Sequence, residues 1–172
     1  MFDGIIVSMS PGLRKHVEGM LKLLDEAAAA YSLTPHFKGR LRTAVILHDI
    51  AKESLLQKDD APFAPIMHAK RSAEIAEKRF NICDRGIIDA IRFHPTGRRK
   101  MTLPEIFLYI IDFAEYSRDF PEASRCRELF LGKHLITALL FAASVKLHYV
   151  IQKKEHVHPD TLQMQEFYEE PH

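Results

Sequence analysis

Apolar side chains recur along this chain at the three- and four-residue spacing of amphipathic helices, and the alternation typical of a half-buried strand is weak throughout. The first helical segment is preceded by Ser10 and Pro11, which resemble an N-cap and a first-turn proline, and we expect Pro35 to end it. Its apolar positions are Leu13, Val17, Met20, Leu24 and Tyr31. A second helix is predicted from about 37 to 52, with apolar residues on one side.

Further helices are predicted at short intervals along the rest of the chain. They are expected at about 67–80, 84–93, 103–116, from 121 onwards and 135–153, with a short turn or helix after His158-Pro159-Asp160. Thr102-Leu103-Pro104-Glu105 matches a capping box. The segment 57–65 contains two aspartates and two prolines and is predicted to be a loop. We therefore expect an all-α helical bundle, one domain over 1–172, with a core at about 11–116 and C-terminal helices at about 121–170.

Length, composition and charge fit a globular protein and exclude several other classes. The chain has 172 residues, 47% of them hydrophobic and 27% charged, so it can bury a substantial core and disorder is not expected. The formal net charge of +1 argues against general nucleic-acid binding. Cys83 and Cys126 are too few for a disulfide framework and lack the spacing of a thiolate zinc site.

The sequence also bears on cellular location. The N-terminal stretch MFDGIIVSMSPG carries an acid at Asp3 and only a short apolar run, so it does not read as a signal peptide. The longest apolar stretch, 135–151, is interrupted by Lys146 and His148, which favours a buried helix over a membrane span. We therefore expect a cytoplasmic protein without membrane association, and two cysteines are compatible with a reducing compartment.

The strongest chemical signal is the adjacent pair His48-Asp49 in the stretch LHDIAK. Helical geometry places His48 near the middle of an apolar stripe and Asp49 at its edge. A partly buried pair of this kind costs free energy unless each group has a partner, and a metal ion binds a neutral imidazole nitrogen and an ionised carboxylate together. By itself, however, a His-Asp dipeptide is common and more often forms a hydrogen bond at a helix end.

Four further side chains of metal-ligand type lie beside apolar positions. His16 flanks the apolar face of the first helix, His68 lies at the start of the third, and His94 lies on the buried side at the end of the fourth. Asp112 lies in the apolar run 110–114, where an isolated acid would be protonated or would need a cation. Each residue taken alone is more often structural than a ligand. Together, four histidines and two aspartates spread over five helices predict a metal site in the bundle core.

The ordered pattern of these six residues resembles the HD superfamily of metal-dependent phosphohydrolases, and within it most closely the YqeK family of HD-domain proteins. The similarity covers most of the chain and is most specific in the stretch DAIRFHPTGR, which is followed by MTL and by IDF, and the tail VHPDT resembles the end of that family's sequences. Two positions depart from the family pattern: Pro95 replaces a threonine or serine, and Tyr116 replaces a proline. Neither departure affects a candidate ligand.

The resemblance implies a hydrolase that splits diadenosine tetraphosphate symmetrically into two ADP molecules. It implies one metal position, held by His16, His48, Asp49 and Asp112. A second position would be completed by His68 and His94, with Asp49 bridging, so that Asp49, His68 and His94 lie at the centre of catalysis. The resemblance implies iron, as one or two ions, and suggests a homodimer. The residue types are also compatible with Mn, Co, Ni or Zn.

The expected mechanism follows from these residue types. A divalent metal lowers the pKa of bound water from ~15.7 to about 7, and the resulting hydroxide would attack a central phosphorus so that ADP leaves as an anion. Phosphate contacts are expected from Lys52, Thr96, Gly97, Arg98 and Arg118. Lys52 could equally be a surface lysine with a buried stem, and Arg118 could equally pair with Glu115 at a helix end.

Three other functions are compatible with parts of this pattern. An HD phosphohydrolase could act on another nucleotide as a phosphatase or phosphodiesterase, and the core residues alone do not separate these reactions. A non-catalytic nucleotide-binding module would keep the same ligands. A nuclease is disfavoured by the small net charge and by the lack of an obvious basic groove.

Overall fold

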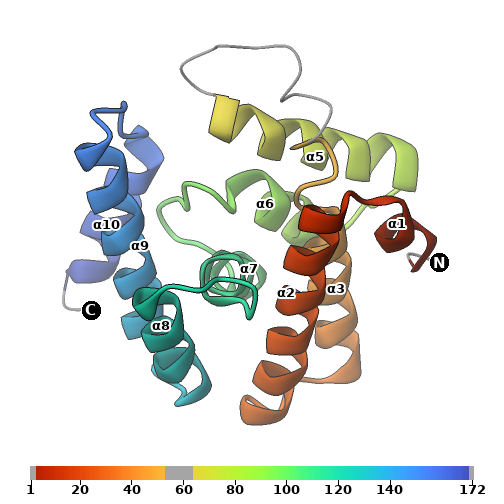
Figure 1. The fold of residues 1–172 in the computed structure, drawn as a ribbon, viewed down its shortest axis with the longest axis horizontal. Helices are drawn as coiled ribbons and strands as arrows, with labels where there is room; N and C mark the ends of the chain where they lie inside the picture. The colour runs from red at the N-terminus through yellow and green to blue at the C-terminus, as the bar shows by residue number, and fades with distance from the viewer. Residues whose placement is uncertain (1–2, 53–63, 171–172) are drawn as a thin grey trace.

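The computed structural model describes residues 3–52 and 64–170, and every regular element in this part of the chain is a helix. The predicted all-α fold class is therefore confirmed. The helices, labelled as in Figure 1, are α1 (Asp3–Ser8), α2 (Pro11–Ala30), α3 (Pro35–Leu47), α5 (Ala64–Phe80), α6 (Arg85–Phe93), α7 (Leu103–Ala114), α8 (Pro121–Leu131), α9 (Leu135–Gln152) and α10 (Pro159–Glu169).

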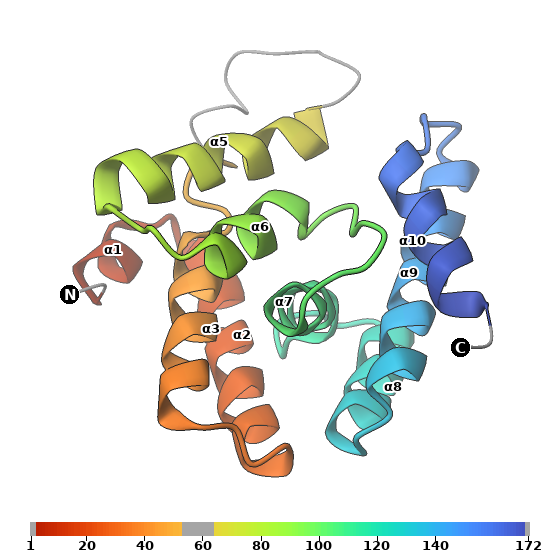
Figure 2. The same cartoon turned by 180° about the vertical axis from the view of Figure 1, so that it is seen from behind.

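Helix α7 lies at the centre of the molecule, and the other long helices pack around it (Figure 1). Helices α2 and α3 lie side by side along one flank, α5 and α6 cover one end, and α8, α9 and α10 form the other flank (Figures 1 and 2). Because helices from both flanks reach α7, residues far apart in the sequence meet at its surface.

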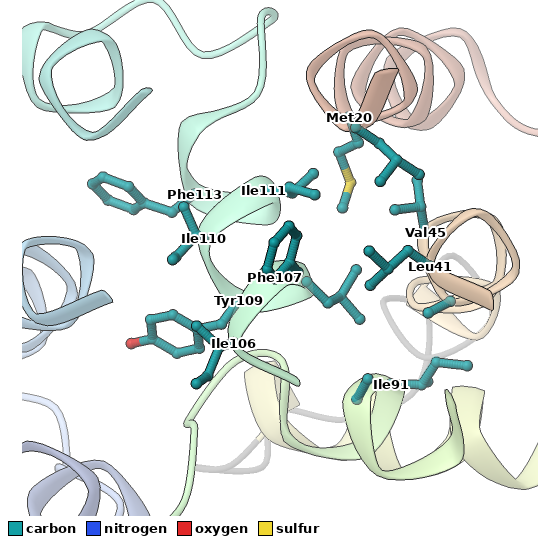
Figure 3. Close-up of a cluster of buried hydrophobic side chains, with 14 of the residues drawn as sticks. Met20, Leu41, Val45, Ile91, Ile106, Phe107, Tyr109, Ile110, Ile111 and Phe113 are labelled. Atoms are coloured by element: carbon teal, nitrogen blue, oxygen red, sulfur yellow. The ribbon is translucent and has the colours of Figure 1, made fainter. Parts of the chain in front are cut away.

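The core is built on α7, which is apolar on almost all of its faces. A helix with this pattern is stable only where neighbours cover every side. Phe107 contributes to a cluster with Met20 of α2, Leu41 and Val45 of α3 and Ile91 of α6, and all five side chains are buried (Figure 3). Burying each such side chain contributes about 1.5–3 kcal/mol to folding. This packing fixes α7, and with it the acidic residue in its last turn.

Prolines begin helices in this fold, and one of them corrects the sequence-based expectation. We expected Pro35 to end the first helix, but α2 already ends at Ala30 and Pro35 opens α3, with Thr34 as the N-cap. Proline suits the first helical position because its missing N–H would have no intrahelical partner there. Ser10 caps α2 as expected, and Thr102 forms the expected capping box with Glu105.

The remaining differences concern the ends of elements. The second predicted helix extends only to Leu47 and not to 52, because residues 48–51 form turns after α3. The short helix α1 was not predicted. In the predicted loop 57–65, residues 57–63 lie outside the described part of the chain, whereas 64 and 65 belong to α5.

Helix α9 is buried along one side only. Among the described residues it is the one helix that is long and apolar enough to cross a membrane by length and composition alone, with a mean hydropathy of 1.5 over 18 residues. Core helices of soluble proteins can pass the same test. The residues of α9 that are buried are Ala138, Leu139, Ala142 and Ala143. The sequence predicted a buried helix here, and the structure buries only the side of α9 that carries these four residues.

Candidate metal centre

The six side chains predicted as ligands come together at one place in the fold. They are supplied by α2, by the turn after α3, by the first turns of α5, by the residue after α6 and by the last turn of α7. His48 and His94 occupy the C-cap positions of α3 and α6, so both rings project from helix ends into the same region. Asp49, which is 2% exposed, lies between them.

The two oxygens of Asp49 face two different groups of imidazoles. Oδ2 lies 3.3 Å from Nε2 of His48, which is itself 3.3 Å from Nε2 of His16. Oδ1 lies 3.0 Å from Nε2 of His68 and 3.6 Å from Nε2 of His94. Within each group the ligand atoms all lie within 4.8 Å of one another. This arrangement could hold two cations that share one bridging carboxylate.

Asp112 joins the first of these groups from α7. Its Oδ1 lies 3.3 Å from Nε2 of His16, so the ring nitrogen of His16 faces both His48 and a carboxylate. All six predicted ligands are therefore connected through short contacts. The sequence could not place Asp112 beside His16, because 96 positions of chain separate them and no periodicity links the two helices.

The donor atoms fit a divalent metal ion. His48 and His94 each donate an Nδ1–H to a backbone carbonyl, that of Val45 at 2.7 Å and that of Ile91 at 2.8 Å. Because a carbonyl only accepts, Nδ1 carries the proton and Nε2 presents a lone pair to the centre. The buried Oδ1 of Asp49 has no hydrogen-bond partner among the described residues. A cation satisfies both the lone pairs and the unpartnered oxygen.

The titration of His94 and Asp112 agrees with this donor set. Burial lowers the pKa of His94 to about 3, helped by the nearby His48, so the ring is a neutral ligand and its contact with Asp49 is not an ion pair. Burial alone would raise the pKa of Asp112, but Lys146 and His16 outweigh it and hold the pKa well below the usual range. Neutral imidazoles beside ionised carboxylates are the form in which these groups bind metals.

Glu115 orients His16 and was not assigned this role from the sequence. Its fully buried carboxylate accepts the Nδ1–H of His16 at 3.0 Å and hydrogen bonds from the backbone and hydroxyl of Ser117. Burial lowers the pKa of His16, but Asp112 and Glu115 outweigh it and raise the pKa to about 9, so without a metal the ring is protonated at neutral pH and has to release this proton when an ion binds. Gly19 makes room for the carboxylate, since a Cβ there would lie 2.0 Å from Oε2 of Glu115. The sequence indicated Glu115 only as the partner of Arg118 at a helix end.

Lys146 reaches the centre from α9 and was also missed. Its ammonium lies 3.5 Å from Oδ2 of Asp112, 3.5 Å from the carbonyl of His94 and 3.9 Å from the ring centroid of Tyr109. Burial lowers the pKa of Lys146, and Asp112 opposes that effect. In the sequence this lysine only interrupts an apolar run, so nothing there indicated a contact with a ligand.

Two of the predicted phosphate-binding residues line a cavity beside His16. The cavity has a volume of about 390 Å³, and Lys52 and Arg118 both contribute to its wall. The ammonium of Lys52 lies 2.9 Å from Asp49, and the guanidinium of Arg118 lies 3.3 Å from Asp112. The positively charged side chains of Lys52 and Arg118 thus face this cavity where it borders the candidate metal centre.

The other three predicted phosphate contacts lie elsewhere. Arg98 pairs with Glu105 at 2.5 Å and with Asp89 at 3.1 Å, which favours a structural role for this side chain. Gly97 has a φ of +66°, and a Cβ there would lie 3.0 Å from Met164. Thr96 lines a second cavity, described below. None of these three residues lines the cavity beside His16.

Comparisons with known proteins agree with this geometry. The chain matches the HD domain family over residues 13–117, a span that includes all six side chains. Two symmetrical bis(5'-nucleosyl)-tetraphosphatases are each 27% identical to it. The one from Bacillus subtilis (strain 168) aligns over 85% of this chain and 83% of its own, and the one from Halalkalibacterium halodurans over 86% and 84%. The crystal structure of a protein from Clostridium acetobutylicum described as a predicted HD superfamily hydrolase involved in NAD metabolism has the same fold, with a TM-score of 0.82 at 24% identity, covering 98% of this chain and 96% of that one.

Proposed function

This chain belongs to the HD domain family and is a metal-dependent phosphohydrolase, and we propose that it hydrolyses diadenosine tetraphosphate symmetrically to two ADP molecules. One observation carries the proposal. The buried carboxylate of Asp49 lies between two groups of imidazoles, and Lys52 and Arg118 line the adjacent cavity. The names of the two relatives support the choice of substrate. Iron as the metal, a homodimer and a cytoplasmic location stay predictions.

When bound, divalent metal ions supply a Lewis acid for a phosphoryl oxygen and a source of hydroxide at neutral pH. The side chains proposed to hold them are His16, His48, Asp49 and Asp112 at one position, and His68 and His94 with the shared Asp49 at the other. Backbone carbonyls keep His48 and His94 in the tautomer that presents Nε2. Since the rings are held before substrate arrives, little reorganisation is needed during the reaction.

Lys52 and Arg118 are proposed to bind the phosphate chain. Both line the cavity beside His16, and each contacts a carboxylate of the centre, Asp49 in one case and Asp112 in the other. A bound metal would neutralise these carboxylates, so the two cations could interact with the negative phosphoryl oxygens instead. The leaving group is an ADP anion that needs no strong general acid, and no residue is assigned that role.

The first experiment is metal analysis of the purified protein, followed by product analysis with diadenosine tetraphosphate. The expected result is a bound transition metal and a single product, ADP, whose formation stops with chelator and resumes when one metal is added back. AMP plus ATP would overturn the symmetrical reaction. Nucleotide that binds and is never hydrolysed would instead favour the binding module.

The matched test of the site is Asp49→Ala. It removes the bridging carboxylate, so we expect loss of metal retention and of turnover while the helical content measured by circular dichroism stays unchanged. Asp25→Ala is the control, because the Asp25 side chain is 61% exposed and pairs with Lys38 at the surface. Retained activity in Asp49→Ala would remove this residue from the centre of the mechanism.

A further inference from the structure

A second cavity, which we call the C-terminal cavity, is lined in part by Lys146, the residue of α9 that contacts Asp112. It has a volume of about 120 Å³ and is lined by Thr96, Lys146, Leu147, Val150 and Val157, among others. Most of its lining comes from residues 146–161, which lie beyond the span 13–117 that matches the HD domain family. The cavity is therefore a feature of the helices added after the metal-binding core.

The C-terminal cavity adjoins the metal centre through one side chain. Lys146 lines the cavity, and its ammonium lies 3.5 Å from Oδ2 of Asp112 and 3.5 Å from the carbonyl of His94. Thr96, which also lines the cavity, follows two positions after His94. Lys146 is therefore a side chain that the cavity shares with the metal centre.

The walls of the cavity suit the uncharged part of a nucleotide. Leu147, Val150, Val157 and Ile66 supply apolar surface, which a phosphate chain avoids because burial there would remove its hydration without replacing it. The polar lining residues are Thr96, Lys146, Glu155, His156, His158 and Thr161, and the two threonines are already joined by a hydrogen bond of 3.0 Å. A cleft with apolar surface and polar groups that fix orientation is the usual setting for an organic ring.

We propose that the C-terminal cavity binds a nucleoside of the substrate and so selects nucleotides over inorganic polyphosphates. This inference rests on the proposed nucleotide substrate and deepens it. The six proposed ligands, Lys52 and Arg118 are proposed to act on the phosphate chain, which nucleotides and inorganic polyphosphates share. To distinguish these two classes of compound, the protein needs a separate surface that contacts the nucleoside. The C-terminal cavity provides that surface within reach of the metal centre.

The test fills the cavity without touching the ligands. Val150→Phe places a ring in the space, and we measure the binding of ADP and of inorganic pyrophosphate to the metal-loaded protein by calorimetry. The affinity for ADP is expected to fall about tenfold or more, whereas that for pyrophosphate stays within about twofold. The matched control is Ile151→Phe, which adds a ring at the next position, where the side chain is 57% exposed and does not line the cavity.

Unchanged ADP affinity in Val150→Phe, or an equal loss for ADP and pyrophosphate, would overturn the proposal. Val157→Phe repeats the test from the segment between α9 and α10 if the first variant does not keep its helical content. The design also separates this inference from the proposed reaction. If Val150→Phe weakens ADP binding but the wild-type protein does not cleave diadenosine tetraphosphate, the proposed reaction is wrong and the role of the cavity holds. If the protein cleaves this substrate but Val150→Phe binds ADP as the wild type does, the reaction holds and the role of the cavity is wrong.

Discussion

At the scale of single residues, three imidazoles of the metal centre are fixed through the nitrogen that faces away from it. His48 and His94 donate to backbone carbonyls, and His16 donates to the buried carboxylate of Glu115. Such outer contacts set the tautomer and ring orientation, and a carboxylate also makes the ring more basic. Glu115 therefore acts on the metal through His16, and Gly19 is the residue that lets it approach.

The first prediction concerns this carboxylate. Glu115→Gln keeps the shape of the side chain but removes its negative charge, so Nε2 of His16 becomes a weaker donor to the metal. We expect the metal affinity to fall by about 10–100-fold. A competition titration against a chromogenic chelator measures this directly, without relying on activity.

The control for this variant is Glu18→Gln, a change at an exposed position of α2, the helix that carries His16. It should leave the metal affinity unchanged. Equal affinities in wild type and Glu115→Gln, with both proteins folded, would limit Glu115 to a structural role.

The sequence indicated the side chains that cluster in the candidate metal centre much better than it indicated their partners. His48-Asp49 and Asp112 could be found because polar groups within apolar runs are costly without a cation. Glu115 and Lys146 could not be assigned, because their contacts join helices that are distant in the sequence. A lysine in an apolar run has the same sequence pattern whether it contacts a ligand side chain or reaches solvent along its stem.

At the scale of elements, an ion pair connects the two helices that end in ligand histidines. Arg40 of α3 contacts Asp84 through two hydrogen bonds of 2.6 and 2.8 Å, and Asp84 also caps α6 through the N–H groups of Gly86 and Ile87. The hydrogen bonds from Arg40 are the main reason that the pKa of Asp84 lies below its usual value. This contact fixes α6 against α3 near their starts.

The prediction at this scale is a pH-dependent loss of stability in Asp84→Asn. The folded pKa of Asp84 is depressed, so its contribution is fully present above the unfolded value of 3.8 and is lost as the pH falls through the folded pKa. The asparagine keeps the cap but not the charge, and the pair is about one-third exposed, so we expect a loss of about 1 kcal/mol at neutral pH after solvent screening.

Urea unfolding of wild type and Asp84→Asn at pH 7 and at pH 3 measures this effect. The difference in the free energy of unfolding should shrink at the lower pH. An equal difference at both values would mean that charge is not what Asp84 contributes. Asp25→Asn serves as the comparison, since its partner Lys38 is half-exposed and the pair should contribute little.

Helix positions were predictable, whereas several helix ends were not. Proline can both end one helix and begin the next, and local sequence did not decide between these roles at Pro35. The end of α3 at Leu47 was hidden because the apolar pattern continues through Ala51, which is buried in the turn rather than in the helix. That difference matters for the site, because it places His48 and Asp49 beyond the last helical turn.

At the scale of the whole molecule, the metal centre joins segments from residue 16 to residue 112, and a cation would hold them together. A ligand that binds only the folded state stabilises it by about 2.7 kcal/mol at a free concentration 100 times its Kd. For a chain of this length, that corresponds to a shift in Tm of about 5–10 °C.

We therefore predict that chelation lowers the Tm and that restoring the metal reverses the change. Differential scanning calorimetry of the same sample before and after chelation provides the measurement. Asp49→Ala should show no shift under either condition. If chelator does not change the Tm of the wild-type protein, no cation bound at these residues stabilises the fold.

The central position of α7 has a consequence for the lifetime of the metal centre. Amide protons of a helix enclosed on all sides exchange with solvent only when the entire chain opens, whereas those of peripheral helices exchange through local fluctuations. Asp112 belongs to this enclosed element, so we expect the backbone that carries it to stay in place while the outer segments open locally. We expect a bound ion to dissociate when the outer segments that carry the histidines open transiently. The carboxylate on α7 would then remain in place to bind an ion again.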